Sequence, residues 1–501
     1  MSSEPIEVPD VDAPSAVLLA IRNAFTLGGA LFGTWGIALG VRILIPRHLG
    51  PAAFGDLNFA DAFTSLLFVT LDLGVNAYIR KEVSVRPSHA SDFYGGALVI
   101  RCIQTAALFA LMTLFLGGRS PEVRNLVYIY GFTQFFVTSN ASLSAMLQSK
   151  GRVGGMSALS VITKVIWGVG CLAAMWFHAG LWLYGVSYLA SESVETVALW
   201  WLAHQHLGLT FRVDVAETKR MLRGSIPYFV TVLTTTAYGN GKLDVTILDF
   251  KLGGREVGYY GVANTTAGLA LLITPLIGWV LQPMLARAAA RSREELYHHV
   301  YRCMELILTV AIPASLVINL GADVWLRLLF RAQYLPATDA LRVLATVFVL
   351  TYIAMIYAIT LVMLEKSWTL ANISALALVV NAVLNLVFVR YSVGWFGEGG
   401  GGTGCALAML GTELFVVTSM MVRIGQGAFD RRSARVIGLS LVAAAAAWVV
   451  HRLLVSIGPA RLAADVAVYL AIVISTGALR PKEMIDTMLL ALRNKKAAAT
   501  E

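Results

Sequence analysis

Five cationic side chains lie within or beside long apolar stretches of the sequence, where an isolated charge is costly. They are Arg22, Arg42, Arg101, Lys164 and Lys242. An arginine guanidinium binds an anion such as phosphate through two parallel hydrogen bonds, and a lysine supplies a point charge. We therefore expect these side chains to face a polar cavity that takes an anionic ligand.

Five acidic side chains occupy similar positions: Asp61, Asp72, Glu192, Glu195 and Asp244. Glu192 and Glu195 are three residues apart and share one face of a helix. Two close carboxylates in a nonpolar environment lose their protons at separate pH values, which suits the binding of a coupling proton, and a sodium ion is the other candidate. Interhelical ion pairs are the alternative, with Lys164 as a partner for the two glutamates. Lys242 and Asp244 are two residues apart and do not face each other, so each needs another partner.

The sequence lacks two common motifs of nucleotide hydrolysis and metal-dependent catalysis. It has no GxxxxGK[ST] phosphate-binding loop and no HExxH zinc motif. The four cysteines lie in apolar stretches without metal-ligand spacing, so we expect four buried thiols and no bound metal. The longest connecting segment, about 204–224, leaves no room for a soluble catalytic domain. We expect no enzyme and no cofactor beyond a coupled proton or sodium ion.

The composition places these charges in a membrane protein. Of 501 residues, 57% are hydrophobic and 14% charged, with a mean hydropathy of +0.71, whereas an average soluble domain has about 25% charged residues. The apolar stretches are continuous, unlike the alternating strands of a membrane β-barrel. We predict an all-α, polytopic protein with about 14 transmembrane helices. The predicted spans are 22–45, 55–79, 95–117, 124–147, 154–177, 181–203, 225–250, 257–285, 301–321, 340–364, 367–390, 403–425, 435–455 and 462–479.

The basic residues predict the orientation of these spans. With a cytoplasmic N-terminus, the cytoplasmic loops carry about twice as many lysines and arginines as the outer loops. An even number of spans then places the C-terminus in the cytoplasm as well. Arg22 and Arg42 lie near the ends of the first span, so snorkelling to the interface is the alternative to ligand binding for both.

An internal repeat predicts two similar halves. Segments 49–55 and 252–258 both read L-G-x4-G after an apolar stretch, and they lie 203 residues apart (252 − 49 and 258 − 55). Both follow an odd-numbered span, six spans apart, and glycine suits a turn with positive φ. The repeat predicts two six-span lobes that enclose a site between them.

The expected organisation follows from these boundaries. It is a disordered cytoplasmic N-terminus (1–21), an N-terminal lobe of spans one to six (22–210), a C-terminal lobe of spans seven to twelve (211–430), two further spans (431–480) and a cytoplasmic tail (481–501).

Several segments together resemble one family in their order and spacing. They are Arg47–Gly55, Leu71–Gly74, Ile79–Glu82, Leu329–Ala337 and Gly402–Ala408. They are similar to the polysaccharide (O-unit) flippases of the multidrug/oligosaccharidyl-lipid/polysaccharide exporter superfamily. Arg331 departs from the pattern, because it stands where a glycine is common. The resemblance implies a V-shaped arrangement of the two lobes, with two additional C-terminal helices, and alternating access to a site between them.

The resemblance also implies a function. The protein would move polyprenyl-diphosphate-linked oligosaccharide repeat units from the cytoplasmic to the outer leaflet of a bacterial inner membrane, for surface polysaccharide biosynthesis. The five cations would bind the diphosphate, with Arg42 near the outer exit, and the five acids would line the cavity or bind the coupling ion. Membrane lipids, a polysaccharide polymerase and glycosyltransferases would be its partners. The net charge of +9 is spread over short loops, so no nucleic-acid partner is expected.

Other functions remain as alternatives. A multidrug or metabolite cation antiporter of the same superfamily would share the two lobes and the buried acids, but it would normally end near twelve spans. A lipid II flippase would share both the spans and the cavity. A membrane glycosyltransferase, polymerase or ligase would need a longer outer loop for sugar chemistry.

Overall fold

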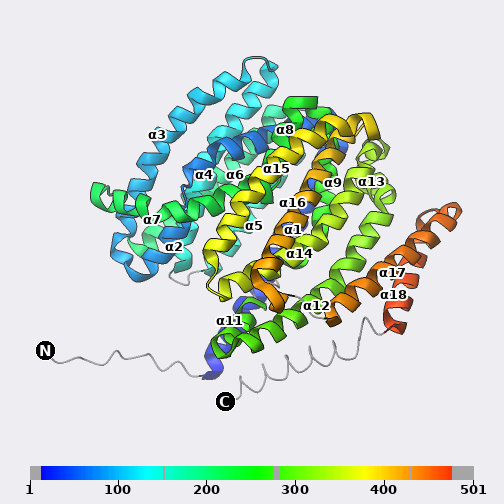
Figure 1. The fold of residues 1–501 in the computed structure, drawn as a ribbon. Helices are drawn as coiled ribbons and strands as arrows, with labels where there is room; N and C mark the ends of the chain where they lie inside the picture. Colours follow the sequence, from blue (N-terminus) through cyan, green and yellow to red (C-terminus); the bar gives the residue numbers. More distant parts are fainter. Residues whose placement is uncertain (1–12, 150–152, 275–280, 429–430, 477–501) are drawn as a thin grey trace.

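The computed structural model of the chain describes residues 13–149, 153–274, 281–428 and 431–476, with the side chains of the first helix described from residue 36 onward. Every regular element of these ranges is helical, as the sequence predicts (Figure 1). The predicted N-terminal segment 1–21 overlaps the first helix, which begins at Ala13, and its residues 1–12 lie outside the described ranges. The predicted tail 481–501 lies outside them too.

The first eleven helical elements belong to the predicted N-terminal lobe and to the start of the C-terminal lobe. They are α1 (Ala13–Leu67), the 3-10 helix η1 (Phe68–Leu71), α2 (Val75–Val85), η2 (Pro87–His89), α3 (Ala90–Leu116), α4 (Pro121–Ser149), α5 (Val153–Trp176), α6 (Leu181–Leu207), α7 (Val215–Thr234), the π-helix η3 (Thr235–Gly239) and α8 (Lys242–Leu252).

The remaining described elements complete the C-terminal lobe and the two additional helices. They are α9 (Gly254–Ala267), η4 (Gly268–Ile273), α11 (Gln282–Arg291), α12 (Arg293–Leu320), α13 (Ala322–Phe330), η6 (Ala332–Ala337), α14 (Thr338–Met363), α15 (Ser367–Phe396), α16 (Gly400–Ile424), η7 (Gly425–Ala428), α17 (Arg431–Leu453), η8 (Val455–Ala460) and α18 (Arg461–Ser475).

Local sequence signals account for several helix ends. The Asp214 carboxylate caps α7 by accepting hydrogen bonds from the backbone N–H groups of Ala216 (2.8 Å) and Glu217 (3.1 Å). The Ser292 hydroxyl caps α12 by accepting from the N–H of Glu295 at 3.0 Å. Both side chains satisfy N–H groups that the first helical turn leaves without a partner.

Over the residues that the structure describes, the predicted spans fall on helices, with spans 22–45 and 55–79 sharing α1, whereas spans 257–285 and 462–479 are described only in part. Within the described ranges, eight helices are long and apolar enough to cross a membrane. Other predicted spans are interrupted, as in α7–η3–α8, or are more polar, as in α6. The polar residues that weaken these helices as sequence signals include several of the candidate site residues.

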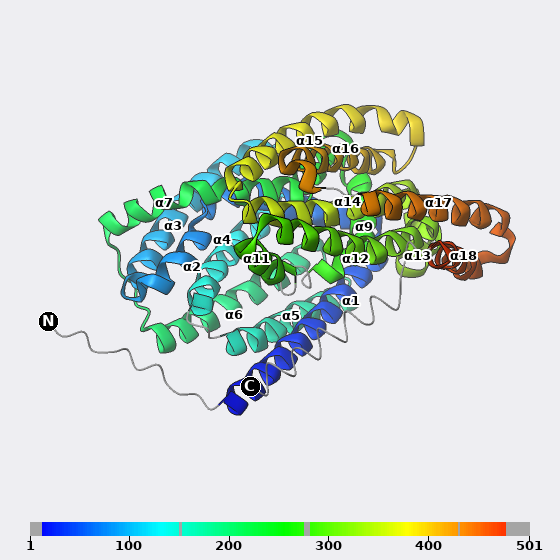
Figure 2. The same cartoon turned by 60° about the horizontal axis from the view of Figure 1, so that its bottom comes forward.

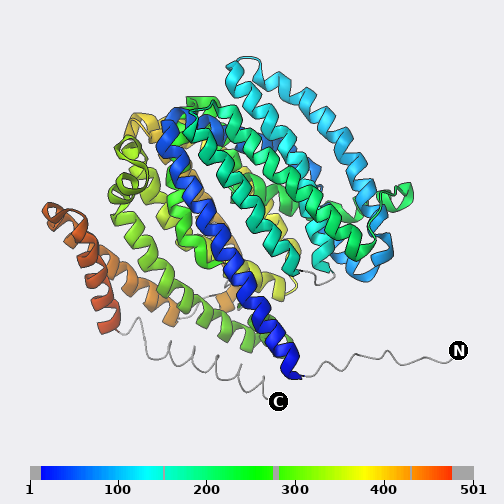
Figure 3. The same cartoon turned by 180° about the vertical axis from the view of Figure 1, so that it is seen from behind.

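The helices alternate between two ends of the molecule. We call the end with the α2–α3, α6–α7 and α14–α15 junctions the proximal end, and the end with the α3–α4, α8–α9, α13–η6 and α15–α16 junctions the distal end (Figure 1). Helix α1 runs from Ala13 at the proximal end across the back of the molecule to the distal end (Figure 3). Helices α17 and α18 pack on each other and on α12 at one side, as appended helices should (Figure 2).

The two copies of the repeat adopt the same backbone conformation at the distal end. Gly50, inside α1, has φ 78° and ψ 173°, and Gly253, between α8 and α9, has φ 85° and ψ 176°. Side-chain-bearing residues rarely adopt this region, whereas glycine does so at little cost. The positive φ predicted for the L-G turn is therefore confirmed in both copies.

The second glycine of each copy allows the two copies to pack against each other. A Cβ atom on Gly55 would lie 1.6 Å from the carbonyl oxygen of Gly254, and one on Gly258 would lie 1.9 Å from the carbonyl oxygen of Pro51. These two contacts are equivalent under the 203-residue offset (258 − 55 and 254 − 51). Helix α9 and the part of α1 after Gly50 thus meet backbone to backbone about a local pseudo-twofold axis.

This contact predicts the effect of a matched pair of substitutions in α1. Gly55→Ala should destabilise the protein by on the order of 3 kcal/mol, because the new methyl group must displace a backbone carbonyl. Gly40→Ala, where no atom lies within 4 Å of the added Cβ, should be neutral or slightly stabilising. Thermal unfolding midpoints of the purified variants in detergent test this, and equal midpoints would show that the backbones need not approach so closely.

Candidate functional site

Of the two predicted cations of the first span, Arg22 and Arg42, the structure describes the side chain of Arg42 only. Arg22 lies in the part of α1 whose side chains are outside the described residues. The Arg42 side chain is exposed, and it forms no ion pair within the described part of the chain. Their roles as ligands of an anion stay predictions.

Lys242 and Asp61 form an ion pair between the predicted lobes. Lys242 begins α8 directly after Gly241, and its ammonium group donates to the Asp61 carboxylate of α1. The two side chains keep 23% and 34% of their surface exposed. This pair gives Lys242 the separate partner that its spacing from Asp244 requires, and it leaves both charges accessible to a ligand.

A second ion pair between the lobes lies at the distal end. The Arg119 guanidinium, in the α3–α4 junction, donates to the buried carboxylate of Asp249 in α8. The same guanidinium stacks over the rings of Phe59 (4.6 Å) and Phe250 (5.3 Å). This pair was not predicted from the sequence, because Arg119 has the pattern of an ordinary loop residue. The signal that was available is Asp249, a carboxylate at the end of an apolar stretch.

Lys164 and Glu192 meet inside the N-terminal lobe. Their charged groups are 3.9 Å apart, and Glu192 also accepts a 3.0 Å hydrogen bond from the Asn140 side-chain amide. Glu195 accepts instead from the Thr163 hydroxyl at 3.3 Å. Of the two glutamates considered as partners of Lys164, Glu192 pairs with it between α5 and α6, whereas Glu195 contacts Thr163 instead.

Arg101 lies in the core of the N-terminal lobe, 1% exposed. Its guanidinium donates to the Leu71 carbonyl (3.1 Å), the Ser142 hydroxyl (2.8 Å) and the Asn76 side-chain oxygen (3.3 Å). Asp72 lies in the same region and accepts from the Asn76 backbone N–H at 3.1 Å. These bonds tie η1 and α2 to α3 and α4, and they use Nε and Nη2, whereas Nη1 is buried without a hydrogen-bond partner among the described residues.

Asp244 belongs to a separate buried polar cluster of the C-terminal lobe. Its carboxylate accepts hydrogen bonds from the Asn385 amide (2.7 Å) and from the Tyr260 hydroxyl (3.1 Å). Asn385 also contacts Asn381 one turn earlier on α15. These asparagines were not singled out from the sequence, because neutral amides attract less notice in an apolar stretch than charges do. Asp244 thus lies apart from Glu192 and Glu195.

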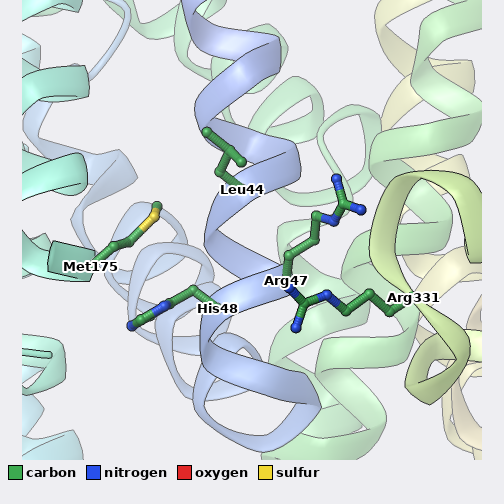
Figure 4. A pocket seen from close by; sticks show the side chains of 5 residues that line it. All are labelled: Leu44, Arg47, His48, Met175 and Arg331. Atoms are coloured by element: carbon green, nitrogen blue, oxygen red, sulfur yellow. The ribbon is translucent and has the colours of Figure 1, made fainter.

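A cavity of about 470 Å³ opens at the distal end, at the boundary between the lobes. It is lined by Leu44, Arg47 and His48 of α1, Met175 of α5, and Arg331 between α13 and η6. Arg331 reaches from its junction toward α1, while Met175 approaches from the opposite side (Figure 4). None of the four predicted cations whose side chains the structure describes lines this cavity: Arg42, Arg101, Lys164 and Lys242. Arg47 and Arg331 occur in the family-like segments, but their types alone did not distinguish them from turn residues.

The described residues also allow a comparison with the predictions about metal ligands and cysteines. No group of three or more metal-ligating side chains gathers within the described ranges. Three of the four cysteines are buried as predicted, but Cys102 on α3 is exposed, so that expectation was wrong for one residue. Cys102 follows the buried Arg101 on α3, and only one face of this helix packs inward.

Comparison with known proteins identifies similar sequences and folds. Residues 20–289 match the family described as polysaccharide biosynthesis protein. No curated protein sequence matches the chain. Among solved structures, the chain is similar to the lipid II flippase MurJ in an inward closed conformation, with a TM-score of 0.69 and 14% identity over 89% of this chain and 97% of that one.

Two transporter structures are also similar. An inward-facing MATE family multidrug resistance transporter of the MOP superfamily has a TM-score of 0.60 and 16% identity, over 78% of this chain and 94% of that one. A MOP superfamily transporter from Pyrococcus furiosus has a TM-score of 0.50 and 14% identity, over 86% of this chain and all of that one. These likenesses establish the fold.

The ion pair between α1 and α8 makes a testable prediction about stability. Asp61→Lys alone should lower the thermal midpoint, because it places two cations side by side, and Asp61→Lys with Lys242→Asp should recover at least half of the loss. Thermal unfolding of the single and double variants in detergent measures the coupling. A double variant that is no more stable than the single one would show that the pair does not form.

Proposed function

The chain belongs to the polysaccharide biosynthesis protein family, and on that premise we propose that it translocates polyprenyl-diphosphate-linked oligosaccharide units across a membrane. The units would move from the cytoplasmic to the outer leaflet, for surface polysaccharide biosynthesis. The family match over residues 20–289 carries this proposal, because it spans the N-terminal lobe and the first helices of the C-terminal lobe. These helices contain the ion pairs that join the two lobes.

The Asp61–Lys242 pair suggests how a diphosphate would act on the protein. Each of its side chains is partly exposed, so a diphosphate that reaches Lys242 competes with the Asp61 carboxylate for the same ammonium group. The diphosphate carries more negative charge than the carboxylate and offers the ammonium group several acceptor oxygens. Substrate binding would thereby release α1 from α8 and weaken the contact between the lobes at the distal end.

Ion pairs at the proximal end would break in the conformation that is open at that end. At the proximal end, Arg86 of the α2–α3 junction approaches Glu217 of α7 to 3.4 Å, and Arg212 approaches Asp92 of α3 to 2.9 Å. Alternating access requires that contacts at one end open while those at the other close. Arg212 is exposed while Asp92 is buried, and Arg86 and Glu217 are partly exposed. Ion pairs whose arginine reaches water suit this exchange, because water compensates much of the loss for that arginine.

The same proposal covers location and energy source. A bacterial inner membrane with both termini in the cytoplasm agrees with the greater number of basic residues in the loops of the proximal end. A proton or a sodium ion at the buried acids would drive transport, with Asp244 and Glu192 as the candidate sites because both are buried. A polysaccharide polymerase and glycosyltransferases would act on the product and supply the substrate.

The two C-terminal helices, α17 and α18, help to choose between the flippase and the antiporter. Helices α17 and α18 extend the chain beyond the two six-helix lobes, which favours a flippase of lipid-linked sugars over an antiporter of about twelve spans. Lipid II is itself a polyprenyl-diphosphate-linked sugar, so a lipid II flippase is the second candidate.

Charge reversal at Lys242 tests the proposed function. Lys242→Glu should reduce export of surface polysaccharide at least tenfold at an unchanged protein level, because it places a second anion beside Asp61 and repels the diphosphate. Lys251→Glu, on the exposed end of the same helix, should support normal export. Complementation of a deletion strain, with polysaccharide quantified by gel, provides the measurement.

Two outcomes would overturn the proposal. Normal export by Lys242→Glu would remove the diphosphate role of Lys242. A deletion strain with intact surface polysaccharide but raised drug sensitivity would favour the antiporter. Translocation assays in proteoliposomes, with lipid II and an oligosaccharide repeat unit as alternative substrates, separate the two flippase functions.

A further inference from the structure

The distal cavity gathers cationic side chains that have no acidic partner. Arg47 and Arg331 line it from opposite lobes, and His48 adds an imidazole whose ring lies 5.4 Å from that of His178. Within the described residues, neither arginine forms an ion pair. The Nε atom of Arg47 is buried and has no hydrogen-bond partner in the described part of the chain. Cations held close together without a counter-charge repel one another, and a bound anion would remove that cost.

One of these cations, Arg331, has a strained backbone conformation. Arg331 has φ 75° and ψ 170°, nearly the conformation of Gly50 and Gly253 at the other distal turns. Glycine adopts this conformation at little cost, whereas an arginine is strained there. His178, whose ring lies tilted beside that of His48, also has a positive φ of 48°. Strained residues that persist in a fold are concentrated at functional sites.

The cavity depends on the approach of the two lobes. The Tyr334 hydroxyl of η6 donates a 2.9 Å hydrogen bond to the carbonyl of Pro46, and this bond anchors the junction beside Arg331 to α1. Tyr334 is fully buried. If the lobes separate at the distal end, Arg331 and Arg47 move apart and the cluster is lost. An anion held by both would therefore favour the conformation in which this end is closed.

We propose that Arg47, Arg331 and His48 form a binding site for a phosphate or diphosphate group at the distal end. The guanidinium groups would bind the anion from both lobes, and the imidazole would supply a further N–H donor. Two sources offer this chemistry: the headgroup of a membrane lipid carrier, or free phosphate in solution. The lipid source rests on the proposed function, whereas the site itself does not.

Binding of labelled inorganic pyrophosphate to the purified full-length protein tests this site. The protein is placed in nanodiscs of phosphatidylcholine, which carries no net charge. Wild-type protein should bind, and Arg47→Gln and Arg331→Gly should each weaken binding at least tenfold. Arg327→Gln, which removes an exposed arginine one turn earlier on α13 and outside the cavity, should change binding less than twofold.

Arg331→Gly keeps the test interpretable, because glycine suits the backbone at this position. Its thermal midpoint should equal or exceed that of the wild type, so a loss of binding cannot be attributed to misfolding. If Arg331→Gly binds pyrophosphate like the wild type, or if the wild type binds none, the proposed site is wrong.

Two further arms separate the source of the anion and the proposed function. If polyprenyl diphosphate in the nanodisc displaces labelled pyrophosphate from the wild type, the lipid headgroup occupies the site, and if it does not, free phosphate does. Either result retains the site. In Lys242→Glu, the part of pyrophosphate binding that Arg331→Gly removes should persist, because Lys242 does not line this cavity, so a failure of the export prediction and a failure of this site are distinguishable.

Discussion

The backbone contact between α1 and α9 is the constraint on which the rest of the distal end depends. Gly55 and Gly258 lack side chains where the carbonyl oxygens of Gly254 and Pro51 pass, so the two repeat copies can meet directly. This close approach brings two pairs of polar groups from opposite lobes within reach of each other. They are the ion pair between Asp61 and Lys242 and the hydrogen bond from Tyr334 to the Pro46 carbonyl. Larger side chains at either glycine would separate the lobes beyond the reach of these bonds.

The charges of the chain divide into those that hold each lobe together and those that join the lobes. Arg101 forms its hydrogen bonds within its own lobe, as Asp244 does in the other, and both are almost completely buried. The pairs between the lobes involve Lys242 and Arg119 at the distal end and Arg86 at the proximal end. In a transporter that changes shape, the contacts within each lobe must stay formed, whereas the ion pairs between the lobes must break and form again.

The sequence predicted the features that depend on local pattern. Apolar stretches located the spans, and the repeated glycines located the two turns with positive φ, because both signals lie within a few neighbouring residues. The partner of Lys242 lies 181 residues away in the chain, and Arg331 meets Arg47 only after the lobes fold together. One sequence carries no signal for such pairings. Residue type alone also could not separate the buried Arg101, which donates three hydrogen bonds inside its own lobe, from an arginine that faces a cavity.

The central claim is that the distal end must open during translocation, and a reversible cross-link tests it most directly. Arg119→Cys and Asp249→Cys replace the distal ion pair in a protein with Cys102→Ser, which removes the exposed thiol. A short bis-methanethiosulfonate reagent then joins the lobes in proteoliposomes that contain lipid-linked oligosaccharide. We predict that cross-linking stops translocation and that reduction restores it. Undiminished translocation by the fully cross-linked protein would contradict the account.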